Sequence, residues 1–134
     1  MALEGAKVLI IEDDIYISRM YQLKLSLDGI KVELADNGKV GLEKVEDFRP
    51  NVILLDILMP EMDGFEVLKA LKADPKNQDI PVLIMSNYGQ EDDIKKGIEL
   101  GAIGYLVKSQ YTPSNVVDKI RSIIEGTYVQ DKAE

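Results

Sequence analysis

The segment from Asn51 to Gly64, with the sequence NVILLDILMPEMDG, constrains the fold of this chain more than any other. It begins with the apolar run Val52–Leu55, which is typical of a strand buried on both faces, as in a parallel sheet covered by helices. The run ends at Asp56, and Pro60 then stops any regular continuation. Turn residues follow, and a helical pattern begins at Phe65. This order of strand, acid, loop and helix predicts an α/β fold with Asp56 at the carboxyl end of a central strand.

The rest of the chain repeats this unit, which predicts a single domain over residues 1–134, with a core from about residue 7 to residue 125 and a frayed tail over 126–134. Apolar or alternating runs predict strands at Lys7–Ile11, Lys31–Ala35, Val52–Leu55, Pro81–Met85 and Gly104–Val107. The helices between and after them are expected to face inward through Tyr16, Met20, Leu23 and Leu27; Leu42, Val45 and Phe48; Ile94 and Ile98; and Val116, Ile120 and Ile123.

Polar side chains stand at the ends of four of the expected strands. Right-handed crossovers bring the carboxyl ends of parallel strands to one edge of the sheet, where open α/β sheets bind their ligands. The residues expected to converge at this edge are Glu12, Asp13, Asp56, Ser86 and Lys108.

The composition of the 134-residue chain excludes several kinds of chemistry. Histidine and cysteine are both absent, which excludes an imidazole base, a thiol nucleophile and a disulfide framework. The 16 Lys and Arg residues against 24 Asp and Glu residues leave a net charge of −8, which argues against direct binding of nucleic acid. No apolar run has the length of a membrane helix, and the start, MALEGAK, contains an acid where a secretory signal would be basic. A cytoplasmic protein without direct membrane contact is expected.

Clustered carboxylates repel one another unless a cation binds between them, and one or two carboxylates with waters suit Mg²⁺. An aspartate can itself accept a phosphoryl group, while a metal ion, a lysine ammonium and a serine hydroxyl spread the charge of the group in transfer. The residues at the sheet edge therefore predict Mg²⁺-dependent transfer of a phosphoryl group to Asp56.

Two other classes of function use part of this pattern. A flavodoxin-type cofactor carrier shares the fold, but it needs a loop rich in hydrogen-bond donors after the first strand, where this chain has Glu12, Asp13 and Asp14. A phosphatase that works through an aspartyl phosphate needs a general acid two residues after its nucleophile, where Leu58 stands. Yellow colour of the purified protein would favour the first alternative, and turnover of a generic phosphate ester would favour the second.

Several of these residues also have purely structural interpretations. Asp14 is better explained as the N-cap of the first helix, Asp63 as a turn residue, and Tyr105 alone as an ordinary strand aromatic. Ser86 and Lys108, each taken alone, are a strand-end hydroxyl and a solvated charge. Their joint occurrence at successive strand ends is what points to a site.

Four motifs, IIEDD, LLDILMPEMDG, LIMSN and GYLVK, occur in this order, and through them the chain resembles the response regulator receiver domains (CheY-like) of two-component signal transduction. The resemblance extends from Val8 to about Ile124. It implies a flavodoxin-like (βα)5 fold, a doubly wound parallel sheet of five strands. The strand order 2-1-3-4-5 is typical of flavodoxin and CheY and comes from this resemblance, not from the periodicity of the sequence.

The resemblance also implies a role for individual residues. Asp56 corresponds to the phosphoacceptor and Lys108 to the phosphate-binding lysine. Ser86 and Tyr105 correspond to the switch residues, of which the aromatic turns inward on phosphorylation. The implied Mg²⁺ ligands are Asp13 directly, Glu12 through water, Asp56, and the backbone carbonyl of Leu58.

By the same resemblance, the phosphoryl group comes from a sensor histidine kinase or a phosphotransfer protein in a phosphorelay. The protein then catalyses only its own phosphorylation and dephosphorylation. Phosphorylation is expected to alter the surface of the fourth helix, fifth strand and fifth helix, about Gln90 to Glu125. A downstream protein or a second copy of the chain is expected to bind to this surface. A stand-alone regulator is expected, the alternative being the receiver part of a larger regulator with a separate output domain.

The chain departs from the family pattern at two positions. Asn87 stands where the family usually has a small residue, and Ser109 stands where it usually has a proline after a cis peptide bond.

Overall fold

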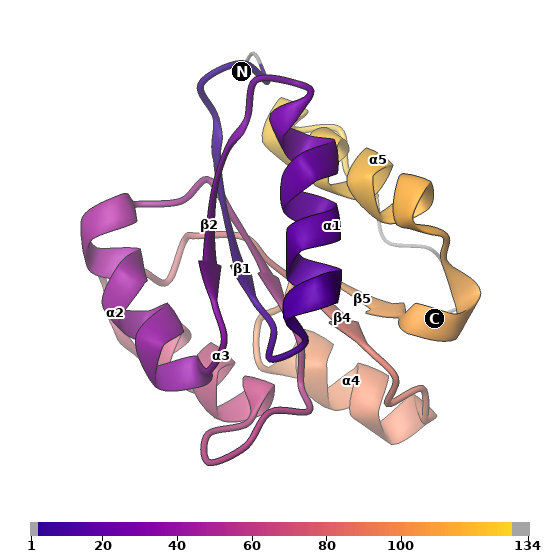
Figure 1. The fold of residues 1–134 in the computed structure, drawn as a ribbon. Helices are drawn as coiled ribbons and strands as arrows, with labels where there is room; N and C mark the ends of the chain where they lie inside the picture. The colour runs from indigo at the N-terminus through magenta and orange to yellow at the C-terminus, as the bar shows by residue number, and fades with distance from the viewer. Residues whose placement is uncertain (1–2, 130–134) are drawn as a thin grey trace.

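A parallel sheet of five strands with helices on both faces makes up the computed structural model, which describes residues 3–129 (Figure 1). The strand order is β2-β1-β3-β4-β5, and every neighbouring pair is parallel. The predicted α/β fold and the strand order implied by the resemblance are confirmed. In chain order the elements are β1 (Lys7–Ile11), α1 (Ile15–Ser26), β2 (Lys31–Ala35), α2 (Gly38–Phe48), β3 (Val52–Leu55), α3 (Gly64–Ala73), β4 (Val82–Ser86), α4 (Glu91–Glu99), β5 (Gly104–Val107), the 3-10 turn η1 (Lys108–Gln110) and α5 (Pro113–Glu125).

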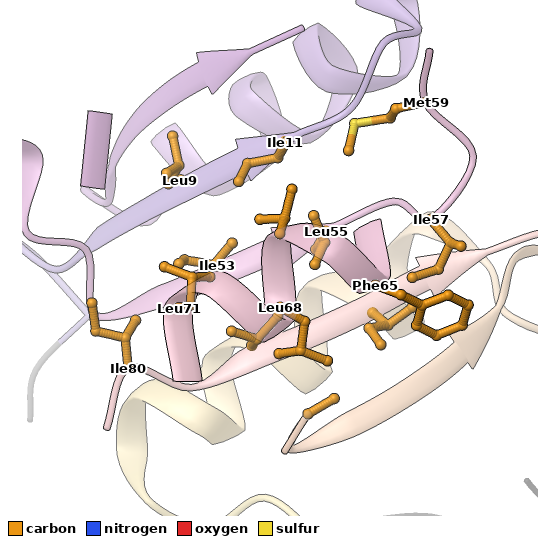
Figure 2. Close-up of a cluster of buried hydrophobic side chains, with 14 of the residues drawn as sticks. Leu9, Ile11, Ile53, Leu55, Ile57, Met59, Phe65, Leu68, Leu71 and Ile80 are labelled. Atoms are coloured by element: carbon orange, nitrogen blue, oxygen red, sulfur yellow. The ribbon is translucent and has the colours of Figure 1, made fainter. Parts of the chain in front are cut away.

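The sheet separates two hydrophobic clusters, and β3 supplies both. Ile53 and Leu55 belong to the cluster under α2, α3 and α4, whereas Val52 and Leu54 belong to the cluster under α1 and α5. All four side chains are buried because both faces of this central strand are covered, and full burial of such a side chain contributes roughly 1.5–3 kcal/mol. The first cluster is seen in Figure 2, where sheet residues meet the α3 side chains Phe65, Leu68 and Leu71.

Short capped junctions lead from the strands into the helices. The Asp14 side chain accepts hydrogen bonds from the backbone N–H groups of Tyr16 (3.0 Å) and Ile17 (3.3 Å), which confirms Asp14 as the N-cap of α1. Asp63 caps α3 and forms a capping box with Glu66, so it has a more specific role than the turn residue expected. These caps satisfy backbone donors at the edge of the sheet where the predicted site residues lie.

The inward face predicted for α1 is wrong for three of its four residues. Tyr16, Leu23 and Leu27 are 85%, 67% and 82% exposed, whereas Met20 packs against the core. The inward face consists instead of Ile17, Ser18, Tyr21 and Leu25. Both stripes have helical spacing, so periodicity alone could not choose between them. The buried Ser18 is tolerated because its hydroxyl donates to the Asp14 carbonyl at 3.0 Å.

A smaller difference concerns α4 and the C-terminal segment. Ile94 packs against the core as predicted, but Ile98 is 39% exposed and Gly97 is buried instead. Of the tail expected to fray, the structure describes Gly126 to Val129, and Tyr128 packs against the second cluster. Residues 130–134 lie outside the described part. Within residues 3–129 no helix has both the length and the apolar character needed to cross a membrane.

Candidate functional site

The carboxyl ends of β1 and β3 lie side by side and place two acids next to each other. Ile11 pairs with Leu55 in the sheet, and the Asp56 N–H donates to the Ile11 carbonyl at 3.0 Å. Glu12 and Asp56 therefore leave adjacent strands at the same level. Both are buried, with 2% and 5% of their surface exposed, which is uncommon for carboxylates without partners.

An acidic group forms where Asp13 joins this pair. One carboxylate oxygen from each of Glu12, Asp13 and Asp56 lies within 4.8 Å of the others. Asp13 is exposed, so the group opens toward solvent on its side. Carboxylate oxygens with an open side for water are the environment that Mg²⁺ prefers in proteins. The residues present therefore fit a divalent cation.

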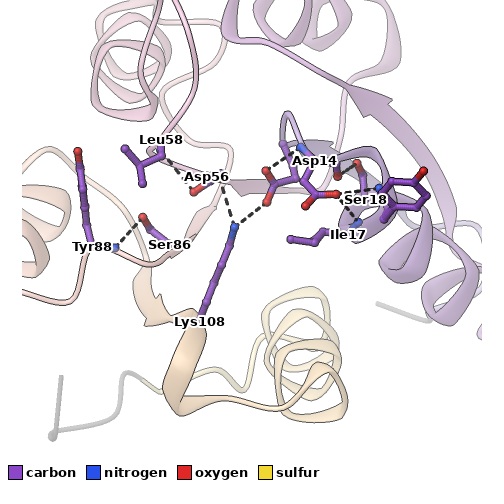
Figure 3. Close-up of polar contacts among 10 residues, drawn as sticks. Asp14, Ile17, Ser18, Asp56, Leu58, Ser86, Tyr88 and Lys108 are labelled. Carbon is purple, nitrogen blue, oxygen red and sulfur yellow. Dashed lines mark hydrogen bonds and ion pairs between the residues drawn. The ribbon is translucent and has the colours of Figure 1, made fainter.

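Lys108 reaches into this acidic group from the end of β5. Its Nζ lies 2.8 Å from Glu12 Oε1 and 3.5 Å from Asp56 Oδ2, and a dashed line in Figure 3 marks the contact with Asp56. The lysine is 17% exposed, so these ion pairs are partly shielded from solvent. A single ammonium thus compensates part of the charge of three carboxylates.

The electrostatics of the group favour an added cation. Burial raises the pKa of Glu12 above its ordinary value, although the hydrogen bond from Lys108 opposes this. Desolvation on its inner side and the neighbouring Glu12 carboxyl raise the pKa of Asp13, even though its outer side reaches solvent. Burial lowers the pKa of Lys108, but Glu12 and Asp56 outweigh it, so this pKa is raised. Holding Glu12 and Asp13 ionised is therefore costly, and a divalent cation would reduce that cost.

Ser86 and Tyr105 are connected through the backbone of Tyr88. The fully buried Ser86 Oγ accepts a hydrogen bond from the Tyr88 N–H at 3.2 Å (Figure 3). The Tyr105 hydroxyl donates to the Tyr88 carbonyl at 2.6 Å. Burial raises the pKa of Tyr105 to about 12, so its hydroxyl stays a donor even at pH values where an exposed tyrosine ionises. A chain of hydrogen bonds thus runs from β5 to the end of β4.

The model of the protein family described as "Response regulator receiver domain" matches residues 8–121 of the chain. The chain belongs to this family. The acidic group of this receiver consists of Glu12, Asp13 and Asp56. This receiver is similar to proteins of two kinds, longer transcriptional regulators and single-domain chains.

Among curated relatives, the probable transcriptional regulator ycf27 of Cyanophora paradoxa is 34% identical over 127 residues, which cover 95% of this chain and 52% of ycf27. The chain spans about half the length of the curated relatives it matches. Among solved structures, the chemotaxis response regulator CheY4 of Vibrio cholerae has a TM-score of 0.82 and 32% identity over 89% of this chain and 98% of its own. The Mn²⁺-bound form of response regulator Rcp1 has a TM-score of 0.77 and 29% identity, covering 88% of this chain and 93% of Rcp1.

The predicted site residues of the receiver come together at one edge of the sheet. Glu12, Asp13, Asp56 and Lys108 form a single cluster, and Ser86 ends the strand next to β3. Leu58 adjoins Asp56, since its N–H donates to Asp56 Oδ1 at 3.4 Å. The roles of these residues in phosphoryl transfer stay predictions.

The Lys108–Ser109 peptide bond differs from the family pattern, and the position of the Tyr105 ring differs from the one expected before phosphorylation. The described residues contain no cis peptide bond, so the Lys108–Ser109 bond is trans, and Lys108 begins η1. The Tyr105 ring is fully buried, which is the inward position that the resemblance associates with phosphorylation. This structure therefore describes the inward arrangement.

Sequence reasoning missed the part played by Gly64 in placing Asp56. A Cβ on Gly64 would clash with the Asp56 carbonyl oxygen and would lie 2.8 Å from Ile57 Cα. The Gly64 N–H also donates to the Ile57 carbonyl at 2.9 Å. The glycine lets the start of α3 approach the backbone just after β3. The motif MDG by itself predicts only turn chemistry, and nothing local in the sequence indicates this contact.

Proposed function

We propose that this receiver accepts a phosphoryl group on Asp56 from the phosphohistidine of a sensor histidine kinase or a phosphotransfer protein. The observation that carries the proposal is the setting of Asp56, a buried carboxylate at a strand end that shares one cluster with Glu12, Asp13 and the Lys108 ammonium. The test is incubation with acetyl phosphate and Mg²⁺ followed by intact-mass measurement. One added phosphoryl group is expected, and EDTA should prevent its addition.

The chemistry follows from the residues around Asp56. A carboxylate oxygen of Asp56 attacks phosphorus, the bond from phosphorus to the donor nitrogen breaks, and the donor imidazole leaves with the electron pair and takes up a proton. Mg²⁺ held by Glu12, Asp13 and Asp56, with the Leu58 carbonyl, would supply positive charge beside the oxygens of the phosphoryl group. The existence of a Mn²⁺-bound form of the similar response regulator Rcp1 supports binding of a divalent cation by this receiver.

Lys108 and Ser86 would hold the product. Lys108 Nζ is closer to Glu12 than to Asp56, so it need only shift toward Asp56 to pair with a phosphoryl oxygen. Ser86 would donate its hydroxyl hydrogen to another oxygen while its Oγ still accepts from the Tyr88 N–H. These contacts stabilise the phosphorylated state relative to the unphosphorylated one.

The lifetime of the aspartyl phosphate should depend on the residues that flank the approach of water. Leu58 and Tyr88 are 44% and 42% exposed, and Figure 3 shows them on the Asp56 and Ser86 side of the site. Neither is an obvious activator of water, so self-dephosphorylation should be slow. Leu58→Asn and Tyr88→Glu should accelerate it by about 10²-fold, the lower end of what a positioned acid or base contributes, because a polar group can orient the attacking water. The rate of self-dephosphorylation is measured as the loss of the phosphorylated mass with time. An unchanged rate in both variants would show that Leu58 and Tyr88 do not limit the attack of water.

We further propose that phosphorylation alters the surface formed by α4, β5 and α5, to which a downstream protein or a second copy binds. The hydrogen-bond chain from Ser86 through Tyr88 to Tyr105 supports this coupling. The match over 98% of the CheY4 chain supports a receiver that acts alone, whereas the longer ycf27 supports the alternative of a separate output domain. Sedimentation of the protein with and without beryllofluoride, a mimic of the phosphoryl group, would reveal a second copy as partner.

Removing the Ser86 hydroxyl should weaken the coupling without preventing phosphorylation. Ser86→Ala keeps Asp56 and Lys108 but loses the group that would tie the β4–α4 loop to the phosphoryl oxygens. A bound group shifts a conformational equilibrium only through its different interaction with the two states. Amide spectra with and without beryllofluoride should therefore show smaller changes across residues 90–125 in Ser86→Ala than in wild type. Changes of equal size would show that Ser86 does not connect the site to this surface.

A further inference from the structure

Gly97 has no side chain, and the inward ring of Tyr105 occupies the space where its Cβ would lie. It is the buried residue of α4, and it faces β4 and β5. A Cβ at this position would lie 2.8 Å from Ile84 Cδ1, 2.9 Å from Tyr105 Cδ2 and 3.3 Å from Tyr105 Cε2. Carbon atoms in contact prefer separations of about 3.5–4.0 Å. The inward ring and a side chain at position 97 therefore exclude each other unless something moves.

A glycine within a helix is unfavourable, so its presence here has a packing reason. Glycine destabilises a helix interior relative to alanine because it loses more backbone freedom on folding. The φ angle of Gly97 is not in the left-handed region, so the backbone does not require glycine. The close approach of α4 to Tyr105 does require it.

Of the groups around Gly97, the Tyr105 ring is the one with an alternative position. Ile84 lies on β4, between two other strands, although its Cδ1 is the end of a flexible chain. The helix α4 is held by Ile94 in the core and by Lys96, whose Nζ lies 4.4 Å from the centre of the Phe65 ring. Tyr105 lies on β5, the edge strand, and an outward ring is the position that the resemblance implies before phosphorylation. A Cβ at position 97 should thus favour the outward ring.

The inward ring also supports the loop that follows Ser86 at the end of β4. Its hydroxyl donates to the Tyr88 carbonyl at 2.6 Å, and the Tyr88 N–H donates to Ser86 Oγ at 3.2 Å. Outward rotation would remove the first hydrogen bond and release the Tyr88 peptide. Ser86 would then lose the partner that orients its hydroxyl.

We propose that Gly97 is a positioning residue of the phosphoryl site, which by admitting the Tyr105 ring keeps Ser86 oriented for a phosphoryl oxygen. This inference rests on the proposed function of Ser86 and Asp56. A side chain at position 97 would lower the population of the inward state. Affinity for a phosphoryl group would fall in proportion to that population.

The sharpest test uses the double variant Ile84→Val/Gly97→Ala, with Ile84→Val as its matched control. Valine lacks Cδ1, so of the three atoms nearest to the new Cβ the double variant keeps the two that belong to the Tyr105 ring. The first measurement is the set of nuclear Overhauser effects from selectively labelled Tyr105 to residues 84 and 97. The second is the affinity for beryllofluoride with Mg²⁺, followed at the amides next to Asp56.

We expect the Overhauser effects to be lost in the double variant and kept in the control. Beryllofluoride should bind the double variant on the order of tenfold more weakly than the control, as a lowered population of the competent state requires. In a Tyr105→Leu background, Gly97→Ala should have no further effect, because the group it displaces is gone. Lys95→Ala, an exposed change on the same helix, should alter neither measurement.

Other outcomes separate the parts of the proposal. An inward ring with unchanged affinity would overturn it, since α4 would have moved instead. An outward ring with unchanged affinity for beryllofluoride would overturn the link from Gly97 to the site. Global unfolding of the double variant would also overturn the proposal, because it would show that the Tyr105 ring cannot move outward to make room for the new Cβ. Failure of wild type to bind beryllofluoride would reject the proposed function, while the Overhauser effects would still decide the steric role of Gly97.

Discussion

Asp56→Asn is expected to abolish phosphorylation of this receiver by acetyl phosphate. The amide has nearly the same shape as the carboxylate and can still accept the Leu58 N–H, so the fold should be retained. Its oxygen is a far weaker nucleophile, and the variant also loses one negative charge of the cluster that would hold Mg²⁺. Intact-mass measurement should show no added phosphoryl group under conditions that label wild type fully.

Asp63→Asn is the matched control for this experiment. It makes the same substitution in the loop after β3, and asparagine caps a helix as well as aspartate does. Labelling of Asp63→Asn should therefore equal that of wild type. Full labelling of Asp56→Asn would instead place the phosphoacceptor elsewhere, and peptide mapping would then locate it.

Asp13→Asn is expected to remove the response of the protein to Mg²⁺ while stabilising the metal-free fold. The substitution keeps the size of the side chain but removes one of three mutually repelling carboxylates. At a hundredfold excess of free Mg²⁺ over its Kd, wild type should gain about 2.7 kcal/mol in free energy of unfolding, whereas the variant should gain little. Without Mg²⁺ the variant should be more stable by roughly 0.2–1 kcal/mol, the scale of exposed charge pairs. Urea titrations with Mg²⁺ and with EDTA measure both quantities.

The neighbouring acid supplies the control for Asp13. Asp14 caps α1 and lies outside the cluster, so Asp14→Asn should keep the cap and the full Mg²⁺ response. An undiminished Mg²⁺ response in Asp13→Asn would remove Asp13 from the set of ligands. A less stable metal-free Asp13→Asn would show that repulsion within the cluster is not what opposes folding there.

The placement of Asp56 could be predicted from the sequence because the local pattern favours one structure. A short continuous apolar run such as Val52–Leu55, ended by turn residues, is typical of a central strand that helices cover on both faces. The acid after it must then lie at the carboxyl edge. The same reasoning brought Glu12, Ser86 and Lys108 to that edge, because parallel strands with right-handed crossovers all end there.

The side of α1 that meets the sheet was not determined by its sequence. The stripe with Tyr16 and Leu23 and the stripe with Tyr21 and Leu25 both have helical spacing. In the folded protein the second stripe packs against the sheet. The strand order was likewise not a consequence of periodicity, since the same alternation of strands and helices can be wound in other orders. Only the family motifs indicated it.

Contacts between distant segments were decided by the tertiary structure alone. Gly64 against the Asp56 carbonyl and Gly97 against Tyr105 look like an ordinary turn residue and a poor helix former until the backbones are brought together. Local sequence determines which side chains are polar or apolar and where each element ends, because those properties act over a few residues. How closely two elements approach depends on the packing of every side chain between them, so the inward position of Tyr105 and its connection to Ser86 became visible only in the folded protein.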